Sequence, residues 1–139
     1  MSLERTYAMI KPDAVAAGNS GKIIDLIEKN GFRIVAMKKL HMTHQQGESF
    51  YGVHKERPFF KGLVTFMTEA PIVALVMERE DAIAKWRELM GATNPANAEA
   101  GTIRKLYAES IDKNAVHGSD SDENAIIEGN FFFSELEKF

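Results

Sequence analysis

One of the four histidines lies in a segment whose composition suits chemistry better than core packing. The stretch NAVHGSDSD (114–122) places His117 directly before a glycine, with two hydroxyls and two carboxylates in the five residues that follow the ring. A neutral imidazole has an unshared nitrogen lone pair, so it can act as a nucleophile without a separate base. Because Gly118 has no side chain, we expect a ligand to approach the ring closely. The other histidines lie at a predicted strand end or on predicted helices among polar residues, and we expect structural or surface roles for them: His41, His44 and His54.

The sequence excludes several other kinds of catalytic site. It has no cysteine, which removes thiolate nucleophiles, disulfides and thiolate metal ligands. Residues 118–121 are not the Gly-x-Ser-x-Gly elbow of hydrolases, and the acidic residues there lack the central glycine of an EF-hand. The stretch GNSGK (18–22) has two residues between its glycines where a P-loop has four. Asp120 and Asp122 have two open roles, metal binding or capping of a helix that starts near Glu123. The remaining possibility is that the histidine itself accepts a phosphoryl group. The N–P bond formed in this way is labile, so the group can be transferred to an acceptor.

Phosphoryl transfer needs positive charge and hydrogen-bond donors around the phosphoryl oxygens, and the chain offers candidates for both. Lys11 directly follows a predicted strand, and strand ends are where sites in sheet proteins collect. Arg87 and Arg104 flank a glycine-containing loop that can bend around a ligand, and Thr93 offers a hydroxyl within that loop. Charged and polar residues of these types usually lie on the surface without a specific role. Their positions, at a strand end and around a glycine-containing loop, are what favour a phosphate site.

The hydrophobic pattern predicts the elements that must position these side chains. Apolar and β-branched runs predict strands at 7–10, 32–42 and 71–78, with a brief strand near Val116. Helical patterns cover 21–30, 43–55, 58–68, 80–90, 102–108 and 123–133. This order matches a ferredoxin-like split βαβ plan of the α+β class, with a four-stranded antiparallel sheet and helices packed on one face. No linker interrupts the chain, and we expect a single domain over 1–139.

Composition and charge narrow the class of protein further. With 45% hydrophobic and 27% charged residues, the chain resembles an ordinary globular protein. A net charge of -3 gives no support to a general nucleic-acid binder. The N-terminal segment is interrupted by charges at Glu4, Arg5 and Lys11, and no apolar run reaches the roughly 18 residues of a membrane span. We therefore expect no signal peptide, no membrane association and a cytoplasmic location.

Five motifs, in unbroken order, make the chain resemble the nucleoside diphosphate kinase family from Thr6 to about Glu137. They are KPDAV (11–15), GFRIVAMK (31–38), FYGVHKERPFFKGLV (50–64), GATNPANAEAGTIR (91–104) and NAVHGSDS (114–121). The resemblance implies a ping-pong reaction in which a nucleoside triphosphate, usually ATP, phosphorylates the histidine and a nucleoside diphosphate then takes the group. It implies that Nδ1 of His117 is the nucleophile. It also implies that Glu128 holds the other ring nitrogen and that Ser119 helps to orient Glu128.

The same resemblance implies the nucleotide-binding residues. The phosphates would be bound and the transferred group positioned by Lys11, Tyr51, Arg87, Thr93 and Arg104. Asn114, together with Lys11, would contact the ribose 3′-hydroxyl. Phe59 would stack on the base in a slot lined by Leu63 and Ile111, and stacking tolerates every base. Mg²⁺ would bridge the phosphates with few direct protein ligands, and the chain would assemble as a homotetramer or homohexamer.

Some positions depart from the family pattern. Ala16 and Ala17 stand where many members carry a polar or basic residue near the oligomer contact, Ala100 stands where a proline is frequent, and Gly129 interrupts the last predicted helix. A non-enzymatic nucleotide-binding or interaction module on the same scaffold is the alternative, and the presence of His117 with its cationic neighbours argues against it. An RNA-binding ferredoxin-like module lacks its aromatic RNP pattern here.

Overall fold

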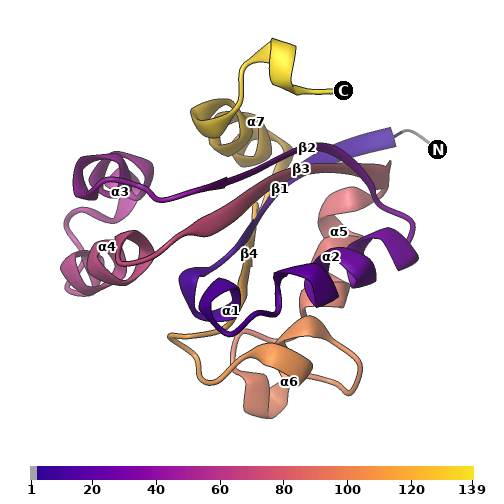
Figure 1. The fold of residues 1–139 in the computed structure, drawn as a ribbon, viewed down its shortest axis with the longest axis horizontal. Helices are drawn as coiled ribbons and strands as arrows, with labels where there is room; N and C mark the ends of the chain where they lie inside the picture. The colour runs from indigo at the N-terminus through magenta and orange to yellow at the C-terminus, as the bar shows by residue number, and fades with distance from the viewer. Residues whose placement is uncertain (1–2) are drawn as a thin grey trace.

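A computed structural model describes residues 3–139 and centres on one twisted antiparallel sheet (Figure 1). Its strands are β1 (Leu3–Ile10), β2 (Arg33–Leu40), β3 (Ile72–Glu80) and β4 (Val116–Gly118). Their order across the sheet is β2-β3-β1-β4, and each neighbouring pair is antiparallel. The predicted α+β class and the ferredoxin-like four-stranded antiparallel sheet are confirmed.

Helices connect the strands. The α-helices are α1 (Pro12–Ala16), α2 (Ser20–Lys29), α3 (His44–Phe50), α4 (Phe60–Thr68), α5 (Ala82–Met90), α6 (Ile103–Tyr107) and α7 (Asp122–Phe132). Short 3-10 turns are η1 (Gly52–His54), η2 (Pro95–Asn97) and η3 (Glu135–Glu137). No helix within residues 3–139 has both the length and the apolar character that crossing a membrane requires.

The helices cover both faces of the sheet, so the expectation that they lie on one face is wrong. Alternate residues of β1 face opposite sides: Ala8 and Ile10 belong to one core cluster, and Tyr7 and Met9 to the other. The first cluster takes in buried residues of α2 and α5, and the second those of α4 and α7. Figure 1 shows α7 on one side of the sheet and α2 with α5 on the other. Each face of the central strands is therefore sealed from water.

The predicted elements match the observed ones apart from their ends and one omission. The helix α1, directly after β1, was not predicted, since residues 11–15 read as the end of a strand at a proline. Pro12 occupies the first turn of α1, where its missing N–H costs no hydrogen bond. The predicted helix 43–55 divides into α3 and the turn η1, and α3 begins with a capping box between Thr43 and Gln46.

The edge strand β4 carries the segment that the sequence singles out. Val116 lies opposite Ile10, His117 opposite Met9 and Gly118 opposite Ala8. Pairing with the fully buried residues Ala8, Met9 and Ile10 of β1 fixes the backbone that carries the imidazole. The chain then turns into α7, whose N-cap is Ser121, with its hydroxyl accepting a hydrogen bond from the backbone N–H of Asn124 (3.1 Å).

Candidate active site

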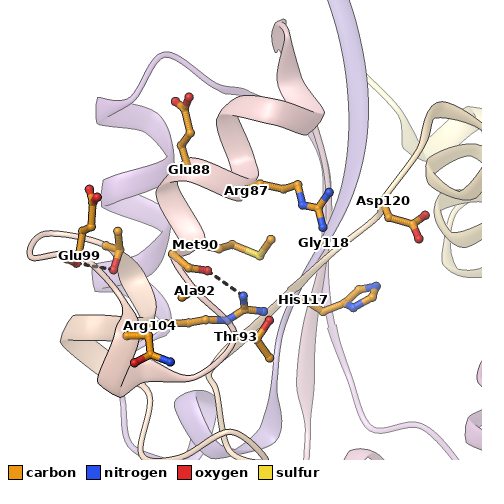
Figure 2. A pocket seen from close by; sticks show the side chains of 13 residues that line it. Arg87, Glu88, Met90, Ala92, Thr93, Glu99, Arg104, His117, Gly118 and Asp120 are labelled. Atoms are coloured by element: carbon orange, nitrogen blue, oxygen red, sulfur yellow. Dashed lines mark hydrogen bonds between the residues drawn. The ribbon is translucent and has the colours of Figure 1, made fainter.

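A pocket of about 640 Å³ lies where α5, the loop that follows it, α6 and β4 meet. Four residues that the sequence predicts for the site line it: Arg87, Thr93, Arg104 and His117. In Figure 2, Arg87 and Arg104 extend into this space from different elements, whereas Glu88 and Glu99 point away from the imidazole. The other lining residues are Glu88, Met90, Gly91, Ala92, Asn97, Glu99, Thr102, Gly118 and Asp120. The pocket thus combines an imidazole with two guanidinium groups.

The imidazole of His117 is held on one side and free on the other. Its Nε2 lies 3.0 Å from Oε1 of Glu128 on α7, and the Ser119 hydroxyl donates to the same oxygen at 2.6 Å. A carboxylate oxygen accepts hydrogen bonds, so Nε2 carries the ring proton and the lone pair is on Nδ1. Trp86 fixes the backbone of the same residue, because its Nε1–H donates to the His117 carbonyl at 3.2 Å. Glu128 therefore holds the ring directly, Ser119 acts on it through Glu128, Trp86 holds its backbone, and none of these contacts uses the lone pair of Nδ1.

A strained turn precedes this histidine. Ala115 is fully buried and has a φ of 73°, which is rare for a residue with a side chain. The N–H of Val116 donates to the carbonyl of Asn114 at 2.8 Å, which closes a γ-turn of positive φ around Ala115. The turn is centred two residues before His117 and sets the direction in which β4 begins at Val116.

Arg104 is buried, and its guanidinium is committed to backbone carbonyls. It donates from Nη1 to Gly91 (3.0 Å), from Nη2 to Val116 (2.9 Å) and from Nε to Asn114 (3.3 Å). Burial and the nearby charge of Arg87 lower the pKa of Arg104 from its usual value. Arg104 therefore ties the loop that follows α5 to the γ-turn while it contributes positive charge to the pocket. Arg87, in contrast, is exposed.

A second set of predicted residues adjoins the pocket. The Lys11 Nζ donates to Oδ1 of Asn114 at 2.7 Å, and Nδ2 of Asn114 donates to the carbonyl of Thr93 at 3.4 Å. Burial, reinforced by the charge of Arg104, lowers the pKa of Lys11 to about 8. These contacts connect the end of β1 to the pocket loop through one amide side chain.

Four other predicted residues do not line this pocket. Tyr51 is buried with its ring edge-to-face on Phe50, and burial together with the charge of Glu128 raises its pKa. Leu63 packs against the core cluster that includes α4. Phe59 and Ile111 are about half exposed, at 52% and 54%. Ile111 lines a separate shallow hollow next to the pocket loop.

Two interpretations of the NAVHGSDS segment are wrong. A Cβ added at Gly118 would overlap the indole of Trp86, so the space beside Gly118 is occupied by protein and not left for a ligand. Neither Asp120 nor Asp122 caps the last helix, because Ser121 has that role. Asp120 instead accepts a hydrogen bond from the side chain of Asn124 at 2.6 Å.

Sequence reasoning also missed residues that shape the site. The rings of Tyr7 and Phe50 lie 6.2 and 6.4 Å from the imidazole and pack beside it. Asp13 accepts a hydrogen bond from the N–H of Ala115 at 3.1 Å. Trp86, a buried residue of α5, contacts both His117 and Gly118. Each of these contacts joins segments that are far apart in the chain, so no local sequence pattern predicts it.

The chain is similar to known proteins over nearly its whole length. The model of the family described as nucleoside diphosphate kinase matches residues 4–138. A nucleoside diphosphate kinase of Geotalea uraniireducens is 62% identical over 135 residues, which cover 97% of this chain and 98% of the relative.

Solved structures give the same result. A crystal structure of the Aquifex aeolicus nucleoside diphosphate kinase superposes with a TM-score of 0.97 at 44% identity, covering 99% of this chain and 100% of that one. The Halobacterium salinarum nucleoside diphosphate kinase, solved in complex with CDP, superposes with a TM-score of 0.93 at 37% identity, covering 99% and 92%. The chain therefore belongs to the nucleoside diphosphate kinase family, whose members move the terminal phosphoryl group of a nucleoside triphosphate to a nucleoside diphosphate through a phosphohistidine.

Proposed function

We propose that His117 is the residue of this chain that carries the phosphoryl group, and that Nδ1 is the atom that bonds to phosphorus. One observation carries the assignment: Nε2 of His117 is held by the Glu128 carboxylate at 3.0 Å, beside a pocket lined by two arginines. That contact fixes the tautomer and leaves a lone pair on Nδ1.

A single nucleophile is sufficient for both half-reactions, the phosphorylation of His117 and the transfer of the phosphoryl group to the second nucleotide. The Nδ1 lone pair attacks the terminal phosphorus of the triphosphate, an N–P bond forms, and the bond from phosphorus to the bridging oxygen breaks. The diphosphate leaves with the electron pair. An oxygen of the second nucleoside diphosphate then attacks the phosphohistidine, and the N–P bond returns its electrons to the ring. While the ring is phosphorylated, the Nε2–H bond to Glu128 stabilises its positive charge.

The surrounding cations suit the charge that develops on the phosphoryl oxygens. Arg87 is exposed on the pocket wall and is free to turn toward a nucleotide, and Arg104 is held in place by three carbonyls. We assign phosphate binding to these two side chains, with Lys11, Thr93 and Tyr51 as further donors. Asn114 already accepts a hydrogen bond from Lys11, which supports a shared role for the pair at the ribose 3′-hydroxyl.

The base would bind outside the phosphate pocket. Phe59 and Ile111 expose apolar surface, and with Leu63 they would form a stacking slot for the base. Stacking reads the face of a base and not its hydrogen-bonding edge, so we propose that all common bases are accepted. The Halobacterium relative was solved with CDP, which supports a nucleoside diphosphate as ligand here.

The family's reaction generally needs a divalent metal ion, and we propose that Mg²⁺ serves here. Within residues 3–139, no group of three or more His, Cys, Asp or Glu side chains is arranged to hold a metal. This fits an ion that arrives on the nucleotide, bound by phosphate oxygens and water, because Mg²⁺ keeps several waters and few protein ligands. The ion would neutralise phosphate charge.

We further propose that residues 1–139 act as one catalytic domain, that the chain forms a homotetramer or homohexamer, and that it works in the cytoplasm. The family match over residues 4–138 supports the first of these. The absence of a membrane-spanning helix from residues 3–139 is compatible with the last.

Incubation with γ-labelled ATP tests the function. We expect one alkali-stable, acid-labile label per chain, lost again when dTDP is added, with dTTP as the product. The variant His117→Ala should take up no label, whereas the matched variant His44→Ala, which alters an exposed histidine on α3, should label fully. Full labelling of His117→Ala would contradict the assignment.

A further inference from the structure

A carboxylate far from His117 in the sequence meets the turn that precedes this histidine. Asp13 lies in the first turn of α1, and its Oδ2 accepts the backbone N–H of Ala115 at 3.1 Å. The two residues are 102 positions apart. Ala115 is the fully buried central residue of the γ-turn, with a φ of 73°.

The turn needs an external partner because its backbone is strained. A residue with a side chain rarely adopts this conformation, and the conformation persists only where its surroundings hold it. Hydrogen bonds from several segments of the chain hold this turn. The Ala115 carbonyl accepts the N–H of Lys11 at 2.8 Å, and Arg104 donates to the carbonyls of Asn114 and Val116. Asp13 supplies the acceptor for the Ala115 N–H.

Asp13 holds this position in an environment that is unfavourable to a carboxylate. Its second oxygen, Oδ1, is buried and has no hydrogen-bond partner within the described residues 3–139. Burial raises the pKa of the Asp13 carboxyl, although hydrogen bonds from the backbone N–H groups of Asp13, Ala115 and Ala14 and the charge of Lys11 act in the opposite direction. A side chain that served only to begin α1 would not need to point into the protein. The geometry fits a side chain whose task is to hold the turn.

We infer that Asp13 is a positioning residue for the phosphoryl transfer: its hydrogen bond to Ala115 holds the strained γ-turn that aims His117 at the phosphate pocket. This inference rests on the proposed phosphorylation of His117. Asp13 does not line the pocket, so it acts through the backbone and not on the nucleotide. Its loss should slow the transfer step and leave nucleotide binding nearly unchanged.

Rapid-quench measurement of His117 phosphorylation by ATP tests the inference. Misplacement of a reacting group by about 1 Å costs up to about 100-fold in rate, so we expect Asp13→Ala to lose about 10- to 100-fold in the maximal rate of phosphorylation, with little change in the ATP concentration that gives half this rate. Asp13→Asn keeps an acceptor oxygen and should retain most of the rate. Asp25→Ala, at an exposed carboxylate on α2, is the matched control and should behave as the unmodified chain.

A double-mutant cycle separates positioning from general damage. Glycine adopts positive φ without steric cost, so in Ala115→Gly the turn depends less on its partner. We therefore expect Asp13→Ala to lose much less rate in the Ala115→Gly background than in the unmodified one. If Asp13→Ala does not fold, Asp13→Leu replaces it, because leucine is close to aspartate in shape and has no acceptor for the Ala115 N–H.

The outcomes are distinct. An unchanged phosphorylation rate in Asp13→Ala, or an equal loss in both backgrounds, overturns the inference while the labelled histidine stands. A change in the half-saturating ATP concentration without a change in the maximal rate overturns it as well. Absence of label on His117 in the unmodified chain overturns the proposed function, and this inference with it.

Discussion

Replacing Lys11 by methionine should reveal a conflict between stability and activity. The Lys11 ammonium lies behind the pocket, hydrogen-bonded to Asn114, and burial together with the charge of Arg104 lowers its pKa from 10.5 to about 8. A pKa lowered by this amount corresponds to about 3 kcal/mol of unfavourable interaction with the charged form. Methionine has a similar length and no charge, so Lys11→Met removes this interaction at every pH.

The direction in which the free energy of unfolding changes with pH follows from which state, folded or unfolded, keeps the Lys11 proton. Below about pH 8 both the folded and the unfolded chain carry the Lys11 charge, and the folded state bears the full cost of burying it. Between about pH 8 and pH 10.5 the folded state loses this proton first. The free energy of unfolding therefore rises with pH across this window, by up to about 3 kcal/mol. The variant lacks the group and should show no such rise.

Urea unfolding of both proteins from pH 7 to pH 11 measures the effect. The difference between their unfolding free energies cancels every other titrating group. Loss of the donor to Asn114 in the variant costs about 1–3 kcal/mol at all pH values, so the pH dependence and not the offset is diagnostic. Meanwhile kcat/KM of the unmodified chain should fall above about pH 8, because neutral Lys11 no longer attracts phosphate. Parallel stability curves for the two proteins would refute this reasoning.

Two further substitutions test single contacts. Arg87→Ala removes an exposed guanidinium from the pocket wall, and we expect kcat/KM to fall by about 10²- to 10³-fold with the unfolding free energy nearly unchanged; steady-state assays with ATP and dTDP check this, and an unaltered kcat/KM would remove Arg87 from the mechanism. Gly118→Ala places a methyl group against the Trp86 indole, and we expect a loss of about 1–3 kcal/mol in unfolding free energy with altered tryptophan fluorescence. A variant as stable as the parent would mean that the indole does not need the space at Gly118.

Periodicity predicted most of the fold, and its failures have identifiable causes. Five residues are too few for a helical pattern, so α1 was missed, although a proline followed by an acidic residue is a signal for a helix start. The sequence also contained a signal that helices cover both faces of the sheet. Residues 7–10 form a continuous apolar run and not an alternating one, which indicates a strand buried on both sides.

The sequence indicated the candidate side chains of the site better than the contacts that hold them in place. His117 stood out by its neighbours in the sequence, and the arginines by their positions around a loop. The hydrogen bond from Ala115 to Asp13, by contrast, spans 102 residues and depends on how β1 and β4 pair. Nothing in the local sequence around Ala115 signals a positive φ, because alanine has no preference for it. Gly118 was noticed, but its purpose depends on Trp86, which is 32 positions away.

The position of the phosphoryl group on the ring tests the central claim most directly. The chain is phosphorylated with ATP, digested at alkaline pH, and the phosphohistidine is compared with synthetic standards of its two isomers. Because Glu128 occupies Nε2 of His117, we expect the Nδ1 isomer alone. Recovery of the Nε2 isomer, or of phosphate on any other residue, would contradict it.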